Sequence, residues 1–326
     1  MDGVSIIICC YNSEKLLPKT LEHIAKQQVD NSLFWEVIIV NNNSSDRTKE
    51  VASSEWNKYV HIYSPINCNF TIIDEPTPGL VYARKAGLNA SRYDILIYCD
   101  DDNWLCENYV QTAYSTMTAN SNIGVVGGYG EPVFENEKKP EWFDQYAKSY
   151  ALGSQNPEKN RSVYGAGMVV NKKALISLYN RNFKGFLVGR QGITLSAGED
   201  TELCLAINTI GYQILYLPDL KYKHFLPEKR LKWDYLENMR TGTANAAVVL
   251  SLYYGVIKNR NRIIFLMYML FRSMLSLFIC LLRDNNDSRN SFEKKKAIIM
   301  IIQNVKNFSL NYHTMKKISG LKNIIK

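Results

Sequence analysis

Strand patterns separated by helical patterns fill the first 100 residues of the chain, and they restrict its fold more than any other feature. Residues 4–10 (VSIIICC), 35–41 (WEVIIVN) and 94–100 (DILIYCD) are apolar runs bounded by polar clusters, which predicts three buried strands. Helical patterns lie between them. This alternation predicts an α/β fold with a mostly parallel sheet and helices on both of its faces.

The predicted helices begin at recognisable residues. One runs from about Ser13 to Gln28 with Ser13 as its N-cap, and the next begins after a cap at Ser44 or Ser45. A third covers 79–91. Ligands bind at the carboxyl ends of the strands in such sheets, so we expect the functional site where the strands lead into these helices.

The pattern is less regular after the third strand. We predict a strand entering an irregular segment over 123–134, and a strand followed by a helix over 164–175. A helix, a glycine stop and another strand are predicted over 199–219. Residues 221–326 are predicted to be helical with basic linkers.

The 326-residue chain has a formal net charge of +8 that is unevenly distributed. Residues 221–326 hold 20 Lys and Arg against 6 Asp and Glu, whereas residues 1–220 hold 19 against 25. The basic character therefore belongs to the C-terminal third. We predict a sheet domain over 1–240 and a helical, basic region over 241–326.

An apolar run of twenty residues, 263–282 (IIFLMYMLFRSMLSLFICLL), lies in this basic region. Its length suits a membrane span, but Arg272 near its centre would cost about 2.5–3.5 kcal/mol in mid-bilayer. A helix in the membrane interface, or a re-entrant one, avoids this cost, and basic flanks would meet anionic headgroups. A buried helix of a soluble fold is the third interpretation. The flanking residues are Lys258, Arg260, Arg262 and Arg283.

Cysteine usage and the N-terminal sequence both indicate the cytoplasm. The seven cysteines include no C-x-x-C pair, which fits a reducing compartment where most thiols are small core residues. Met1-Asp2-Gly3 leads directly into the first strand without a signal-peptide pattern. We expect a cytoplasmic protein attached peripherally or monotopically to the inner face of the cell membrane.

Three adjacent carboxylates, Asp100, Asp101 and Asp102, follow the third predicted strand. A bound divalent cation would relieve their mutual repulsion, because hard cations prefer carboxylate oxygens. Magnesium takes one or two protein carboxylates and shares the rest of its shell with phosphate oxygens and water, which suits a nucleotide diphosphate. The stretch fits equally well a solvated acidic turn in which an Asp caps a helix at Trp104.

Other candidate residues have two interpretations each. Glu199 and Asp200 begin an amphipathic helix, where they either complement the helix dipole or supply a general base for an acceptor hydroxyl. His224 is either a metal or phosphate ligand or a surface histidine. Arg84 either binds a diphosphate or is solvated on a polar helix face.

Five segments occur in order along the chain: SIIICCYNSEKLL, IIVNNNSSDRT, GLVYARKAGLNAS, DILIYCDDD and GEDTELCLAINTIGYQILYLPD with YKHF after it. Together they resemble the motifs of family 2 inverting glycosyltransferases of the GT-A fold, a Rossmann-like sheet that binds nucleotide-diphospho-sugars. The resemblance covers about Val4 to Arg240. The segments resemble the opening strand with its Y-N turn, the V-D-N-N-S-S-D motif, the G-x-x-x-A-R-N-x-G helix, the D-x-D strand and the E-D helix.

The resemblance implies a role for each candidate residue. Asp102 would coordinate a Mg²⁺ or Mn²⁺ ion that bridges the donor diphosphate, and His224 would be the second metal residue. Asp200 would be the general base, and Glu199 would orient the acceptor. The residues implied in binding the donor nucleotide are Tyr11, Asn12, Asn41, Arg84, Asp100 and Asp101.

Two positions depart from the family pattern and bear on the choice of donor. Asn41, which would line the base pocket with Tyr11, stands where the family usually has an Asp that accepts a hydrogen bond from the imide N–H of uracil. The Asn41 amide can also accept, but it donates as well, so a UDP-sugar is favoured while GDP- and dTDP-sugars stay open. Arg84-Lys85 replaces the usual Arg-Asn.

The predicted function is that of a hexosyltransferase-like, inverting enzyme of polysaccharide biosynthesis. It would move one sugar from a nucleotide-sugar to a hydroxyl of a lipid-linked glycan. The alternative is a catalytically inactive, membrane-docked, nucleotide-binding scaffold of the same fold. A processive synthase is disfavoured, because several long apolar spans are missing and KRLKW (229–233) matches Q-x-x-R-W only in part. A dinucleotide oxidoreductase is set aside for want of a glycine fingerprint after the first strand, and no nucleic-acid partner is expected.

Overall fold

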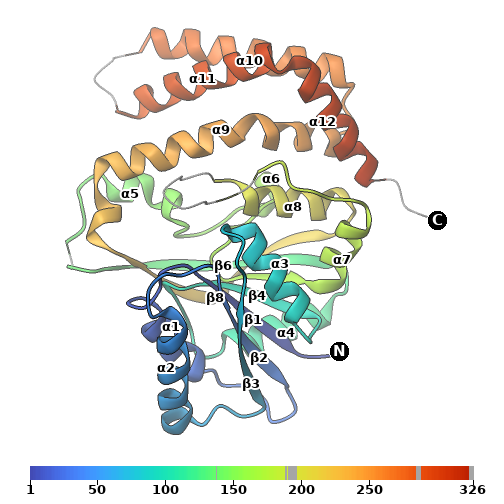
Figure 1. Cartoon of the computed structure of the whole chain (residues 1–326). Helices are drawn as coiled ribbons and strands as arrows, with labels where there is room; N and C mark the ends of the chain where they lie inside the picture. Colours follow the sequence, from blue (N-terminus) through green and yellow to red (C-terminus); the bar gives the residue numbers. More distant parts are fainter. Residues whose placement is uncertain (137, 188, 190–196, 284–287, 323–326) are drawn as a thin grey trace. The chain divides into compact units, whose positions relative to one another are not determined.

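The computed structural model describes residues 1–136, 138–187, 189, 197–283 and 288–322 (Figure 1). The chain forms two compact units. The first comprises Met1–Ser177 and Tyr212–Leu231, and the second comprises Leu178–Gly211 and Lys232–Lys326. The division into a functional domain over 1–240 and a region over 241–326 stays a prediction.

The first unit is built on an eight-stranded sheet. Its strands are β1 (Val4–Cys10), β2 (Trp35–Asn41), β3 (Cys68–Asp74), β4 (Ile95–Asp100), β5 (Asn103–Leu105), β6 (Ile123–Phe134), β7 (Met168–Asn171) and β8 (Gln213–Leu226). They lie in the order β3-β2-β1-β4-β7-β6-β8-β5. The first four strands of this order are parallel, and β6 and β8 are parallel to each other. β7 runs antiparallel to both of its neighbours and β5 runs antiparallel to β8, so the sheet is mixed.

Helices occur in both units (Figure 1). The first unit contains α1 (Leu17–Ala25), α2 (Thr48–Tyr63), α3 (Leu80–Ala90), α4 (Tyr109–Ala119), α5 (Phe143–Tyr146), η1 (Ala147–Tyr150), α6 (Pro157–Asn160), most of α7 (Lys172–Asn180) and η2 (Glu228–Leu231). The second contains α8 (Glu199–Thr209), α9 (Trp233–Ile257), α10 (Arg262–Leu281), α11 (Ser288–Lys306) and α12 (Phe308–Leu321).

Helices cover both faces of the sheet, as predicted. Alternate residues of β1 point to opposite faces. Ile6 and Ile8 belong to the core formed with α1, α2 and α4, whereas Ile7 meets Gly87 of α3 on the other face. Because both faces are buried, β1 needs apolar residues at nearly every position, and this is the continuous run seen in the sequence.

The predicted strands are confirmed as β1, β2, β4, β6, β7 and the first part of β8. Two strands were not predicted. β3 is at the edge of the sheet and contains exposed and half-buried residues, so its sequence lacks a continuous apolar run. β5 has three residues, too few for a periodic pattern.

The predicted helix caps are wrong at two places. Ser13 does not cap α1; its hydroxyl accepts a hydrogen bond from the Tyr11 N–H at 3.1 Å. α2 begins at Thr48, and the Asp46 carboxylate accepts from the Thr48 N–H at 3.0 Å in place of a hydroxyl of Ser44 or Ser45. The polar residues after β1 and β2 instead connect the two loops, as described below for the site.

The chain after β8 and η2 is mainly helical where it is described, which confirms that part of the prediction. The prediction is wrong for residues 221–226, which continue β8 as a strand. α10 covers the apolar run 263–282 up to Leu281 and is the one helix, among the residues described, that is long and apolar enough to cross a membrane. Its backbone N–H groups at Ile263 and Ile264 are capped by the Asn261 side chain at 3.1 and 3.3 Å.

Substitution of Gly87 by Ala tests the packing of α3 on the sheet. A Cβ at this position would lie 2.4 Å from Ile7 Cγ2, so Gly87→Ala is expected to lower the free energy of unfolding by about 1–3 kcal/mol. The control is Gly320→Ala in α12, where a Cβ meets nothing within 4 Å and where Ala should be neutral or stabilising by up to about 1 kcal/mol. Urea unfolding measures both; equal effects would contradict the packing described here.

Candidate functional site

The loops after β1 and β2 are tied together at the carboxyl edge of the sheet. Asn12 adopts a left-handed backbone conformation with φ of 53°, and its N–H donates to Ser44 Oγ at 3.1 Å. Its side-chain Oδ1 accepts from the Ser45 N–H at 2.8 Å. Tyr11 is 53% exposed beside it. Asn12 therefore fixes the loops. Tyr11 has an exposed ring, and its part in binding the donor stays a prediction.

Asn41 ends β2, and its amide orientation is determined by Asp74. The Asn41 Nδ2 donates to Asp74 Oδ1 at 3.0 Å, and Lys49 Nζ binds Asp74 Oδ2 at 2.5 Å. Lys49, followed by Asn41, lowers the pKa of the Asp74 carboxyl, so this group only accepts. The Asn41 Oδ1 atom is then left buried, without a hydrogen-bond partner in the part of the chain that is described. It is an acceptor suited to an N–H of a ligand.

Asn42, which sequence reasoning missed, positions the start of α3. Its Nδ2 donates to the carbonyl oxygens of Glu75 at 3.0 Å and Thr77 at 2.6 Å. Its Oδ1 accepts from the Gly79 N–H at 2.8 Å. A buried amide that makes three bonds to one loop fixes that loop against β2.

Arg84 on α3 points to the sheet. The residue is 9% exposed, and its Cζ lies 5.1 Å from the ring centre of Tyr98 on β4. This is a cation–π distance. The interpretation of Arg84 as a solvated surface residue is therefore wrong, and the predicted place on the nucleotide side stays a prediction.

The acidic triplet forms the turn between β4 and β5. Asp102 has a side chain only 3% exposed, and its Oδ1 accepts from Asn103 Nδ2 at 3.1 Å. Its carbonyl oxygen accepts from the Phe225 N–H of β8 at 2.9 Å. Trp104 lies in β5 and no helix begins there. The interpretation as a solvated turn with a helix cap is therefore wrong.

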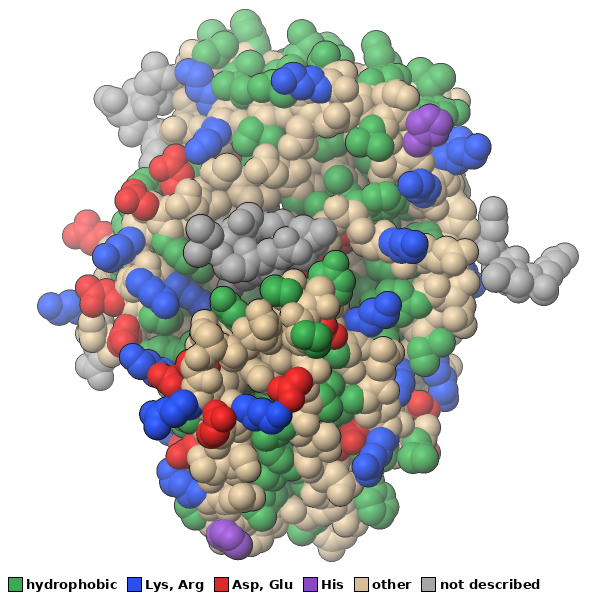
Figure 2. Space-filling view, viewed as in Figure 1, with side chains coloured by type: hydrophobic (Ala, Val, Ile, Leu, Met, Phe, Trp, Pro, Cys, Tyr) green, Lys and Arg blue, Asp and Glu red, His purple; other side chains and the backbone are tan. Residues whose placement is uncertain are grey.

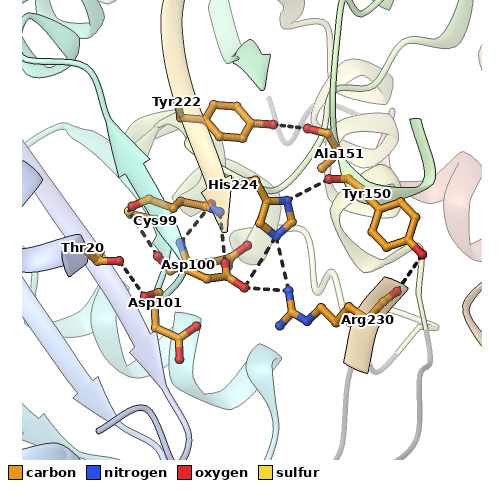
Figure 3. A network of polar contacts seen from close by, with 11 residues as sticks. Thr20, Cys99, Asp100, Asp101, Tyr150, Ala151, Tyr222, His224 and Arg230 are labelled. Carbon is orange, nitrogen blue, oxygen red and sulfur yellow. Dashed lines mark hydrogen bonds and ion pairs between the residues drawn. The ribbon is translucent and has the colours of Figure 1, made fainter. Parts of the chain in front are cut away.

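The three carboxylates have different surroundings. Asp100 is half-buried at the end of β4. Burial, and then the charge of Asp102, raises the pKa of Asp101 to about 7. The Asp101 carbonyl oxygen accepts from Thr20 Oγ1 at 2.6 Å (Figure 3). Adjacent carboxylates that are buried or half-buried resist simultaneous ionisation unless a cation is near.

Arg230 is a cationic partner of the triplet (Figure 3). Its Nη1 lies 2.6 Å from Asp102 Oδ2, and its side chain is 17% exposed. The same Nη1 lies 3.3 Å from His224 Nε2, and His224 Nε2 lies 3.5 Å from Asp102 Oδ2. The two predicted metal residues, Asp102 and His224, are thus brought together, and the Arg230 guanidinium is bonded to the Asp102 carboxylate.

His224 is 8% exposed, so its interpretation as a surface histidine is wrong. Its Nδ1 lies 2.8 Å from the carbonyl oxygen of Tyr150, as seen in Figure 3. A carbonyl only accepts, so Nδ1 donates its hydrogen to Tyr150. Nε2 faces Arg230 Nη1 and Asp102 Oδ2. A backbone carbonyl behind a ligating imidazole is the usual support of a metal-binding histidine.

The donor atoms of Asp102 and His224 fit a divalent cation. Two atoms that each bind Mg²⁺ at about 2.1 Å lie at most about 4.2 Å apart, and Asp102 Oδ2 and His224 Nε2 are 3.5 Å apart. No cluster of three or more His, Cys, Asp or Glu able to hold a metal occurs within the described ranges. The pair would therefore share an ion with ligand oxygens and water, and Arg230 would have to release Asp102 Oδ2.

Glu199 and Asp200, the predicted catalytic residues, begin α8 in the second unit and stay predictions. Sequence reasoning missed Glu202 in the same helical turn. Glu202 is 1% exposed and accepts hydrogen bonds from the Phe186 N–H and the Tyr253 hydroxyl, both at 2.9 Å. It joins the segment before α8 to α9.

Sequence reasoning also missed Arg230. The stretch KRLKW (229–233) matches Q-x-x-R-W only in part, and nothing in it distinguishes Arg230 from Lys229 as a site residue. The contact to Asp102 joins residues 128 positions apart.

The comparisons with known proteins agree with this geometry. The glycosyl transferase family 2 model matches residues 5–178, more than half of the chain. The chain belongs to glycosyl transferase family 2, and the predicted family and enzyme class are confirmed. A curated relative, glycosyltransferase GlyA of Streptococcus pneumoniae serotype 4, is 25% identical over 230 residues. That match covers 68% of this chain but only 30% of the relative.

Solved structures confirm the GT-A fold. TarS 1–349 of S. aureus in complex with UDP-GlcNAc has a TM-score of 0.55 at 15% identity, covering 98% of this chain and 89% of that one. The mannosyltransferase PcManGT of Pyrobaculum calidifontis, in complex with GDP-Man and Mn²⁺, has a TM-score of 0.56 at 16% identity, covering 93% and 86%. At these identities the likeness extends to the fold alone.

Removal of the Arg230 side chain tests its role as the counter-charge of Asp102. Arg230→Ala leaves a buried carboxylate without this guanidinium, and it should lower the free energy of unfolding by about 3 kcal/mol. Lys229→Ala, an exposed neighbour on η2, should change it by less than about 0.5 kcal/mol. Urea unfolding measures both variants.

Manganese gives a second measurement on the same variants. Mn²⁺ should raise the melting temperature of Arg230→Ala more than that of the wild-type protein, because no guanidinium competes with the ion for Asp102. Equal stability of the two variants, or equal shifts with Mn²⁺, would contradict this role of Arg230.

Proposed function

We propose that the chain transfers one sugar, with inversion at the anomeric carbon, from a nucleotide-sugar to a hydroxyl of a lipid-linked glycan. The observation that carries this proposal is the buried Asp102 carboxylate beside His224 and Arg230 at the carboxyl edge of the sheet. Ligands of open α/β sheets bind at this edge. Asn41 with its buried acceptor lies at the same edge, at the end of β2.

The base of the donor would be one that carries a ring N–H. Asn41 Oδ1 is a buried acceptor, and uracil, thymine and guanine each offer a ring N–H, whereas cytosine and adenine offer a ring nitrogen that accepts. TarS and PcManGT, which share the fold, are described with UDP-GlcNAc and GDP-Man respectively. These observations support a UDP-sugar, with GDP- and dTDP-sugars as the other candidates.

The diphosphate would lie over the acidic turn. Asp102 and His224 would hold a Mg²⁺ or Mn²⁺ ion, and Asp100 and Asp101 would contact the ribose, the sugar or the water shell of the ion. When bound, such an ion stabilises negative charge on the departing nucleoside diphosphate. Arg230, once released from Asp102, presents a guanidinium suited to two diphosphate oxygens.

Asp200 would be the general base of a single displacement. Its carboxylate would take the proton of the acceptor hydroxyl while the hydroxyl oxygen forms a bond to the anomeric carbon. The bond from that carbon to the diphosphate oxygen breaks on the opposite side, and its electron pair leaves with the nucleoside diphosphate. Glu199 would orient the acceptor. Attack opposite to the leaving group inverts the configuration.

The second unit supports the proposed acceptor and location. A basic helical region with one long apolar helix supports attachment to the inner face of the cell membrane, where a lipid-linked glycan is available. The predicted attachment is peripheral or monotopic.

Two carboxylate-to-amide variants separate donor binding from transfer. Asp102→Asn should abolish the Mn²⁺-dependent part of nucleoside-diphosphate binding, because a neutral amide is a poor ligand for a hard cation. Asp200→Asn should keep that binding and lower the transfer rate by about 10²–10⁴-fold, the usual contribution of a general base. Thermal shift measures binding, and release of nucleoside diphosphate measures transfer.

Asp219→Asn is the matched control, because Asp219 is an exposed carboxylate on β8. It should leave both readouts unchanged. Metal-dependent nucleotide binding without turnover by the wild-type protein, with any donor and acceptor, would instead support the inactive scaffold.

Paired nucleotides test Asn41. Binding of UDP over CDP, or of GDP over ADP, should be favoured by about tenfold, because within each pair the ring N–H is replaced by an acceptor. Asn41→Ala should remove this preference while leaving the affinity for the disfavoured member nearly unchanged. Isothermal titration with Mn²⁺ present measures both; a preference that survives in Asn41→Ala would show that another residue selects the base.

A further inference from the structure

A basic pocket of about 540 Å³ lies in the second unit, where the end of α9, the start of α10 and the end of α12 meet. Three of its lining side chains are cationic, Arg260, Arg262 and Lys322, and its lining residues include no Asp or Glu. Nothing in the proposed transfer reaction uses this pocket. A concentration of positive charge without a lining carboxylate is complementary to an anion.

The cations are held in different ways. Lys322 Nζ donates to the Asn259 side chain at 2.5 Å, which fixes it in the wall. Arg262 Cζ lies 5.6 Å from the ring centre of Tyr312. Arg260 is exposed and also lines the pocket. A rigid ammonium with two guanidinium groups suits a phosphate group, whose several oxygens accept from more than one donor.

An apolar stripe begins at the rim of this pocket. Ile263 lines the pocket and is 56% exposed as the first apolar residue of α10. Further along the helix Ile264, Phe271 and Phe278, seven residues apart, are 70%, 64% and 58% exposed. Figure 2 shows hydrophobic side chains gathered along the top of the view, over α10 and α11. Soluble proteins rarely leave such a stripe uncovered.

The opposite side of α10 is used within the protein. The buried residues of this helix are Leu266, Met269, Ser273 and Cys280. α10 packs against α11, and Asn290 of α11 donates to the Cys280 carbonyl oxygen at 3.0 Å. One side of α10 is therefore occupied by the unit itself, and the other side is exposed.

We propose that the pocket binds the phosphate of an anionic phospholipid and that α10 lies in the plane of the bilayer with its exposed stripe among the acyl chains. In a phospholipid the phosphate is joined to hydrocarbon chains. The basic pocket would match the phosphate, and the adjoining apolar stripe would match the hydrocarbon. Arg272 is about 100° round the helix from Phe271, at the border of the stripe. There its side chain reaches the headgroups, whereas a spanning helix would place the charge in hydrocarbon.

This inference rests on the proposed membrane attachment, and it assigns that attachment to named residues. It does not depend on sugar transfer. Vesicle binding is measured without donor or acceptor, so a failure of the transfer proposal and a failure of the pocket proposal give different results.

The test is co-flotation of the full chain with vesicles of phosphatidylcholine alone or with added phosphatidylglycerol. The wild-type protein should bind the anionic vesicles more tightly. Arg260→Ala combined with Arg262→Ala should weaken that binding by about tenfold or more, because the phosphate would lose two of the three cationic side chains that line the pocket. The matched control is Lys316→Ala combined with Lys317→Ala, two exposed lysines of α12 outside the pocket. It should keep most of the affinity.

Phe271→Ser tests the stripe separately, because it should weaken binding to both kinds of vesicle while the preference for phosphatidylglycerol stays. Circular dichroism checks that each variant is folded, and Arg260→Glu alone replaces the double variant if that one unfolds.

Four results would overturn the proposal. Equal losses in the pocket and control variants would mean that positive charge attracts the membrane without a specific site. Equal binding to both kinds of vesicle would mean that the pocket does not select an anionic headgroup. Retention in the membrane after alkaline carbonate washing would indicate a span. A dimer in solution that Phe271→Ser dissociates would show that a second copy covers the stripe.

Discussion

Burial of the Asp102 carboxylate is the constraint on which the site depends. An ionised carboxylate with a side chain 3% exposed is tolerated only beside a cation and hydrogen-bond donors. Arg230 supplies the cation from η2, and Asn103 donates to the other oxygen. The end of β8 and the turn after it are therefore part of the site. A metal ion bound there would replace Arg230 as the positive partner of the Asp102 carboxylate.

The accuracy of the sequence prediction for each strand follows from its burial. β1, β2 and β4 are covered on both faces, so each needs a continuous apolar run, and each was predicted. β3 at the sheet edge is half-exposed, and β5 exists because Asn103 and its neighbours pair with β8 more than a hundred residues away. The helix-cap predictions are wrong because the polar side chains near the helix starts bond between loops instead, as Asn12 does with Ser45.

The site residues divide in the same way. The acidic turn, Asn41 and His224 were predicted because each lies in a short stretch whose local pattern resembles a family motif. The residues that bond to these side chains were not predicted. Asp74, which fixes the Asn41 amide, is 33 residues away in sequence, and Arg230, which bonds to Asp102, is 128 residues away. Such contacts arise from the folded sheet and leave no periodic signal in the chain.

The pairing of β5 with β8 bears on how fast the proposed metal ion could replace Arg230 at Asp102. Asn103, next to Asp102, lies directly opposite His224 in the antiparallel register. The carboxylate and the imidazole are therefore mounted on one two-stranded ribbon, and their backbone positions are fixed before any ligand arrives. Exchange of this guanidinium for the proposed metal ion would then need only rotation of the Arg230 side chain. Side-chain rotation is much faster than rearrangement of a loop, so this step need not limit turnover.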